Sequence, residues 1–85
     1  MVYLRKILSD NTIIKYESGV NGKDYIGTIE FRVDVPINTP FQNRNPKLSY
    51  YKNFSFCGVT ASALQGIAKF IRENNYPDKY LRATH

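Results

Sequence analysis

One segment, from Tyr25 to Val35, alternates between apolar and polar side chains more regularly than any other part of the 85-residue chain. Its odd positions are apolar apart from Gly27, and its even positions are polar apart from Ile26. A period of two is typical of a β-strand that buries one face and exposes the other. The pattern therefore predicts a two-faced strand with its odd positions turned toward a core.

Three further segments have strand character. Thr12–Glu17 is rich in β-branched residues, and an Asn-Gly turn signal lies between it and the segment described above, so the two should form a β-hairpin. Leu48–Cys57 also alternates and is expected to pair with the second hairpin strand. Val2–Leu8 is short and partly apolar, which suits an edge strand.

A helical pattern occupies the C-terminal third of the chain. Thr60 suits an N-cap, Asn74 and Asn75 suit the helix end, and Pro77 could open one further helical turn over Asp78–Arg82. The apolar stripe of the helix is spaced i, i+3, i+4, i+7 and consists of Leu64, Ile67, Ala68 and Ile71, widened by Ala63 and Phe70.

The order of these elements predicts one α+β domain spanning residues 1–85. It is a small two-layer fold, with a three- to four-stranded antiparallel sheet packed on one C-terminal helix. The opposite face of the sheet then stays open to solvent or to a partner.

Gly66 lies in the middle of the predicted helix, where glycine costs about 1 kcal/mol relative to alanine. One interpretation is that another helix, a ligand or a second copy of the chain approaches closely here. A homodimer through the helix around Gly66 is therefore one expectation, and a tolerated substitution is the alternative.

The formal charge of +5 arises in one window without acidic residues. From Val35 to Arg72 there are five basic residues and neither Asp nor Glu, whereas seven basic and seven acidic residues balance outside it. The window also holds six of the twelve aromatic residues. Cations interleaved with flat rings favour a ligand that carries phosphates and bases.

Seven residues are candidates for contacting such a ligand. Four of them should converge if the proline-rich loop from Pro36 to Lys47 folds toward the helix as a flap; the alternatives are a passive loop and cations that only keep the surface soluble. Others belong to the outer face of the sheet, which could equally be a solvated surface with cross-strand ion pairs. The candidates are Arg32, Arg44, Lys47, Tyr51, Lys52, Lys69 and Arg72.

Catalysis has little support in the sequence. The only histidine is His85, the last residue, and the only cysteine, Cys57, has no histidine upstream to act as its base. The spacing of potential metal ligands matches no common site. We therefore expect no enzyme activity, no cofactor and no metal. The single cysteine, and the absence of a signal-like or membrane-spanning stretch, favour a cytoplasmic protein.

The succession of strands and a helix, with G-K-x-Y-x-G-x-I-E-F from Gly22 to Phe31, resembles in outline the sheet-type DNA-binding domains of the phage-integrase arm class. That resemblance implies a sheet that contacts the major groove. It is one of element order, and it assigns no role to any individual residue.

The sequence thus predicts a non-enzymatic binding protein for a phosphate-bearing ligand. That ligand is either a nucleic acid or a nucleotide-type signal molecule, which a phage-type protein of this size could sequester. The alternative is a small protein-interaction or inhibitor module that uses exposed tyrosines as anchors.

Overall fold

The computed structural model describes residues 2–20, 24–50 and 57–82. Five strands, one α-helix and one short 3-10 helix follow one another along the chain. They are β1 (Val2–Ser9), β2 (Ile13–Val20), β3 (Asp24–Arg32), η1 (Phe41–Asn43), β4 (Lys47–Tyr50), α1 (Cys57–Glu73) and β5 (Lys79–Arg82).

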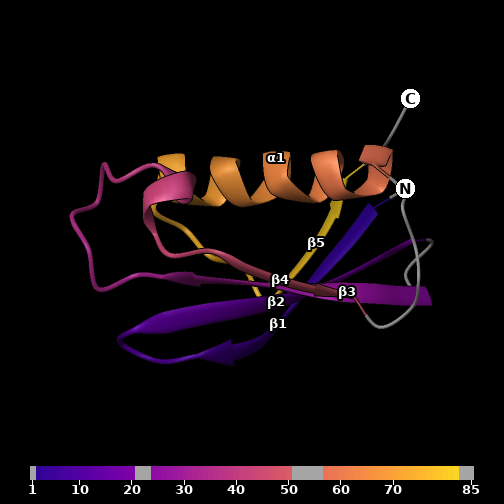
Figure 1. Ribbon diagram of the computed structural model, residues 1–85, viewed down its shortest axis with the longest axis horizontal. Helices are drawn as coiled ribbons and strands as arrows, with labels where there is room; N and C mark the ends of the chain where they lie inside the picture. Colours follow the sequence, from indigo (N-terminus) through magenta and orange to yellow (C-terminus); the bar gives the residue numbers. More distant parts are fainter. Residues whose placement is uncertain (1, 21–23, 51–56, 83–85) are drawn as a thin grey trace.

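The strands form one antiparallel sheet in the order β4-β3-β2-β1-β5, and α1 lies across one of its faces (Figure 1). The fold is therefore α+β in two layers, as predicted, but with five strands rather than three to four. The predicted hairpin of β2 and β3 and the pairing of the next strand with β3 are both confirmed. Residues 51–56 of the predicted third strand lie outside the described residues.

The strand that the sequence did not predict is β5. A helical turn over this segment was expected because Pro77 suits a helix start, and that prediction was wrong. The backbone of β5 instead pairs with β1, and the Tyr80 ring packs edge-on against Phe70 with 5.0 Å between ring centroids. As a result β1, expected at an edge, lies between β2 and β5.

The core lies between α1 and the inner face of the sheet. Register places Ile14 opposite Phe31 and Tyr16 opposite Ile29, so the odd positions Ile29 and Phe31 of β3 face the core as the alternation predicted. The fully buried Tyr16 donates a hydrogen bond of 2.7 Å from its hydroxyl to the Pro77 carbonyl oxygen. Burial, and secondarily the charge of Asp78, raises the pKa of this phenol, which therefore stays protonated.

The helix begins earlier than expected and buries most of the predicted stripe. It starts at Cys57, so Thr60 lies inside it rather than at its cap. The expected end is confirmed, because Asn74 adopts a left-handed conformation with φ of 50° directly after Glu73. Ala68, expected in the apolar stripe, is exposed. Among the helix side chains that the structure describes, the buried hydrophobic ones are Ala63, Ile67, Phe70 and Ile71, all within the predicted stripe.

Gly66 allows the helix to lie close to the sheet. A Cβ atom at this position would lie 3.0 Å from Leu4 Cδ1 and 3.4 Å from Tyr80 Cε1. The close approach predicted from the sequence is therefore made within the chain, to β1 and β5. This removes the observation that suggested a homodimer through Gly66.

Candidate functional site

The loop between β3 and β4 folds back over the core and reaches the helix. Phe41, at the start of η1, is half-buried and packs edge-on against Phe31 with 5.9 Å between ring centroids. Two backbone hydrogen bonds tighten the loop, from Thr39 N to Pro36 O at 2.9 Å and from Asn43 N to Pro40 O at 3.0 Å. The loop is thus part of the folded layer that covers the sheet.

Arg44 holds this loop in place from the inside. The residue is only 2% exposed. Its guanidinium donates to three backbone carbonyl oxygens: Nε to Thr39 O at 2.8 Å, Nη1 to Arg32 O at 3.1 Å and Nη2 to Ile37 O at 3.2 Å. The backbone of Arg44 also accepts a hydrogen bond of 2.9 Å from Arg32 N. One side chain therefore ties the turn at residues 36–39 to the end of β3.

A pocket of about 520 Å³ lies between this loop and the helix. Segment 37–42 forms one wall, and Ala68, Ile71 and Arg72 of α1 form the other. We call it the loop–helix pocket. Its volume falls within the range of about 300–1,000 Å³ that is usual for small-molecule sites. Phe41 and Ile71 make its surface largely apolar, and Asn38, Gln42 and Arg72 add polar groups.

The charged residues that line or support the loop–helix pocket are of one sign. Arg72 is exposed and is the only charged residue among the described residues that line it. The buried Arg44 guanidinium lies directly behind the wall, because two of its hydrogen bonds go to the carbonyl oxygens of Ile37 and Thr39. No carboxylate of residues 2–20, 24–50 or 57–82 forms an ion pair with either arginine.

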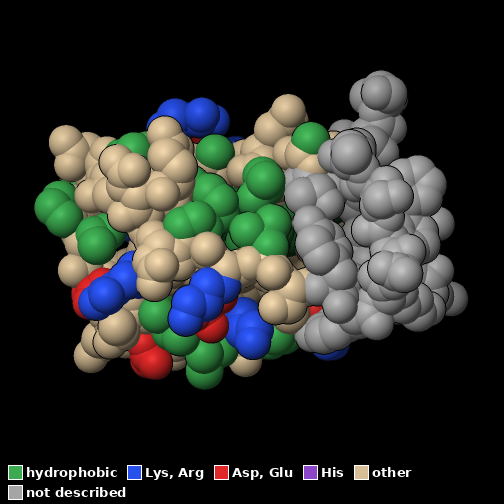
Figure 2. Space-filling view, in the orientation of Figure 1, with side chains coloured by type: hydrophobic (Ala, Val, Ile, Leu, Met, Phe, Trp, Pro, Cys, Tyr) green, Lys and Arg blue, Asp and Glu red, His purple; other side chains and the backbone are tan. Residues whose placement is uncertain are grey.

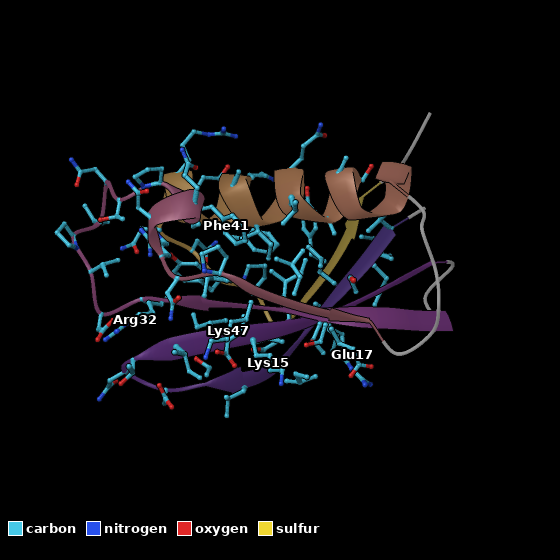
Figure 3. All side chains as sticks on the ribbon, viewed as in Figure 1. Lys15, Glu17, Arg32, Phe41 and Lys47 are labelled. Carbon is cyan, nitrogen blue, oxygen red and sulfur yellow. The ribbon has the colours of Figure 1, made fainter. Side chains whose placement is uncertain are left out.

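The sheet face turned away from α1 is here called the open sheet face. Its cations, unlike those at the pocket, lie beside acidic residues. Figure 3 shows Lys15, Glu17, Arg32 and Lys47 on this side, whereas Phe41 points from η1 toward the core. Acidic and basic side chains alternate across the strands: Lys47 lies opposite Glu30, which lies opposite Lys15. In Figure 2 blue and red side chains accordingly lie side by side along the lower part of the molecule.

Three ion pairs neutralise much of the charge on the open sheet face. Arg5 contacts Glu17 at 3.1 Å, Lys47 contacts Glu30 at 3.9 Å, and Arg32 forms two hydrogen bonds with Asp34. The hydrogen bond from Arg32 is the main cause that lowers the pKa of the Asp34 carboxyl below its ordinary value. The expected cross-strand ion pairs are therefore present.

The carboxylates of two of these pairs are recessed beneath their partners. The side chain of Glu17 is 12% exposed and that of Arg5 is 42% exposed; the corresponding values are 21% for Glu30 and 66% for Lys47. Cationic ends therefore project furthest from the sheet, although most of them have an acidic neighbour.

The predicted site residues do not converge on one point. Arg32 and Lys47 lie on the open sheet face, Arg44 is buried, and Arg72 borders the loop–helix pocket. Lys69 is half-buried, with its Nζ 5.1 Å from the centre of the Tyr80 ring. Tyr51 and Lys52 lie outside the described residues. Of the four cations expected to meet if the loop folded toward the helix, Arg72 lies at the loop–helix pocket and Arg44 behind its wall, whereas Lys47 lies on the open sheet face.

Sequence reasoning missed the residues that shape the loop–helix pocket. The loop was recognised by its prolines, but Phe41 within it was counted only as one aromatic of the basic window. An isolated aromatic between two prolines, opposite a helix with an apolar stripe, was the available signal that the loop packs onto the core.

Comparisons of this chain with protein-family models, with curated proteins and with solved structures found no match. The resemblance to sheet-type DNA-binding domains gains no support from them. Within the described residues, α1 is not long and apolar enough to span a membrane, and no cluster of three or more His, Cys, Asp or Glu residues could hold a metal ion.

Proposed function

We propose that this protein binds a small phosphate-bearing ligand of the nucleotide type in the loop–helix pocket, without transforming it. One observation carries the proposal: a pocket of about 520 Å³ with an apolar surface has an exposed arginine as the only charge among its described lining residues. A concave apolar site with a few polar groups is the usual setting for small ligands.

The two ends of such a ligand match the two kinds of surface in the pocket. A flat base would lie against Phe41 and Ile71, and the amide side chains of Asn38 and Gln42 are suited to its polar edges. The phosphate would meet Arg72, whose planar guanidinium can donate two parallel hydrogen bonds to an oxyanion.

The proposal stops at binding because the lining residues offer no chemistry. None of the described residues around the pocket is a His, Cys, Asp, Glu or Lys that could serve as nucleophile or general base. The sequence suggested that a phage-type protein of this size could sequester a nucleotide-type signal. A pocket that only binds such a ligand would be enough for that role.

The test compares Arg72→Gln with Arg32→Gln in calorimetric titrations with adenosine monophosphate. Arg72 borders the pocket, whereas Arg32 is an arginine on the open sheet face and serves as the matched control. We expect Arg72→Gln to weaken binding about tenfold, because it removes a hydrogen-bonded charge, and Arg32→Gln to leave it unchanged. Equal effects of the two substitutions would contradict the pocket as the site.

A nucleic acid on the open sheet face is a second candidate, and the recessed carboxylates favour it. Because Arg5 and Lys47 project beyond Glu17 and Glu30, an approaching phosphate backbone would meet cations first. Affinity for duplex DNA should then fall steeply with salt, and Lys47→Gln should reduce that salt dependence. Binding that is independent of salt, or unaltered by Lys47→Gln, would remove this candidate.

The alternative of a protein-interaction module gains no exposed anchor from the tyrosine side chains that the structure describes. Of the four tyrosine side chains that the structure describes, Tyr16 is buried and Tyr3, Tyr76 and Tyr80 are half-buried. Tyr76 and Tyr80 pack against the core. None of these four offers the exposed anchor that the alternative requires.

A further inference from the structure

The structure points to a doubly charged phosphate monoester as the ligand class of the loop–helix pocket, with Arg44 as the residue that positions the pocket wall and supplies a second positive charge behind it. The inference rests on the proposed function and deepens it. It distinguishes a free nucleotide or another phosphomonoester from a nucleic-acid backbone, in which each phosphate is a diester with one charge.

The positioning role follows from the hydrogen bonds of Arg44. Two of its three acceptors, Ile37 O and Thr39 O, belong to residues that line the pocket, and the third, Arg32 O, belongs to β3. Because the guanidinium is planar and rigid, these bonds fix the wall relative to the sheet before any ligand arrives. A preorganised site loses less conformational freedom on binding.

The electrostatic role follows because Arg44 is buried and none of the three acceptors of its guanidinium is a carboxylate. Arg44 is 2% exposed, and its polar partners are neutral carbonyl groups. The nearest acidic residue along this part of the chain, Asp34, is engaged by Arg32 on the open sheet face. Arginine carries a positive charge in proteins. Dissolved ions screen a buried charge less than they screen a surface charge.

The pocket therefore has one cation at its edge and another behind its wall. Arg72 can contact a ligand oxygen directly, whereas Arg44 acts through the field across the loop backbone. A phosphate monoester carries close to two negative charges at neutral pH. Both cations attract its two charges. A diester or a sulfate ester carries one negative charge, so its electrostatic attraction to the two arginines is about half as large.

The experiment uses three adenosine derivatives that differ mainly in charge. Calorimetric titrations compare adenosine 5′-monophosphate, the sulfate ester of the same shape with one negative charge, and uncharged adenosine. For the unaltered protein we expect the phosphate to bind about tenfold more tightly than the sulfate. In Arg72→Gln the preference should shrink to about threefold but persist, because Arg44 is still present.

The outcomes separate this inference from the proposed function. Equal affinity for phosphate and sulfate in the unaltered protein would overturn the inference while leaving a pocket that binds nucleotide-type ligands. A preference that disappears entirely in Arg72→Gln would overturn the electrostatic role of Arg44. No binding of any of the three compounds would overturn both the inference and the proposed function.

Arg44→Lys tests the positioning role. Lysine keeps the charge but cannot present the planar fork that reaches three carbonyl oxygens. We expect the affinities for phosphate and sulfate to fall together, with their ratio retained. Unchanged affinities would overturn the positioning role. Circular dichroism checks that the variant is folded, and the Arg72→Gln titrations keep the inference testable if it is not.

Discussion

The loop–helix pocket and the open sheet face both have arginines, but the hydrogen-bond partners of these arginines differ in charge. On the open sheet face Arg32 forms an ion pair with Asp34, and Arg5 does so with Glu17. In the loop wall Arg44 is satisfied by three backbone carbonyl oxygens, and no carboxylate among the described residues pairs with it. One surface is largely neutralised, and the other retains its positive charge.

This difference shows why net charge alone does not locate a binding site. A cation that already has a carboxylate partner must give up that pair, or share it, to bind an external anion. A cation held by neutral dipoles keeps its full charge for a ligand. The few unbalanced cations beside a concave apolar surface are therefore more informative than the larger number of cations on the sheet.

The largest expected effect is on stability and contrasts two arginines. Replacing Arg44 with Met should lower the free energy of unfolding by about 3 kcal/mol, because it leaves three carbonyl groups without their buried donor. Arg32→Met should lower it far less, because the ion pair of Arg32 is exposed. Urea denaturation measures both. Similar losses of unfolding free energy in the two variants would contradict the difference between the two regions.

A smaller effect is expected for an aromatic residue of the loop. Phe41→Ala should lower the free energy of unfolding by about 2 kcal/mol, because it removes the half-buried ring that packs on Phe31. It should also weaken adenosine monophosphate binding, since Phe41 lines the pocket. Leu81→Ala, at an exposed position on β5, provides the control and should alter neither property. A stable Phe41→Ala variant with intact binding would speak against the loop as a binding wall.

A weak coupling is expected between partners on the open sheet face. A double-mutant cycle of Lys47→Ala and Glu30→Ala should give a coupling free energy of about 0.5 kcal/mol, because Lys47 Nζ and Glu30 Oε2 are 3.9 Å apart and the lysine is exposed. The cycle is measured by chemical denaturation at low salt. A coupling well above 1 kcal/mol would mean that this pair is far less available to an external anion than we propose for the second candidate.

The smallest effect concerns pH. The pKa of Asp34 lies below its ordinary value of 3.8 mainly because of the hydrogen bond from Arg32. The stability that this bond contributes is therefore fully present above pH 4 and is lost as the pH falls through the lowered pKa. Melting temperatures from pH 5 to pH 2 should fall slightly less in Asp34→Asn than in the unaltered protein. Identical acid profiles would mean that the pair contributes nothing to stability.

The sequence predicted well those features that repeat locally. The alternation from Tyr25 to Val35 correctly separated the buried Ile29 and Phe31 from Glu30 and Arg32 of β3, because a strand turns successive side chains to opposite faces. The helix end was also predictable, since Asn74 readily adopts the left-handed conformation observed there.

Features that depend on distant contacts were not predictable in the same way. β5 exists because its backbone pairs with β1 from the other end of the chain, and Pro77 pointed to a helix instead. Arg44 was interpreted as an available cation, because no local pattern reveals that three carbonyl groups converge on it. The acid-free window was a real property of the sequence, but the tertiary structure places Lys47 on the open sheet face and Arg72 beside the loop–helix pocket.

The most direct test of a phosphate-ligand site in the loop–helix pocket is a titration of the ¹⁵N-labelled protein with adenosine monophosphate, followed by NMR. We predict amide shift changes concentrated in residues 37–42 and 68–72, with little change on the open sheet face. Changes concentrated on the strand residues Lys15, Glu30 and Lys47, or no changes at millimolar nucleotide, would contradict the account.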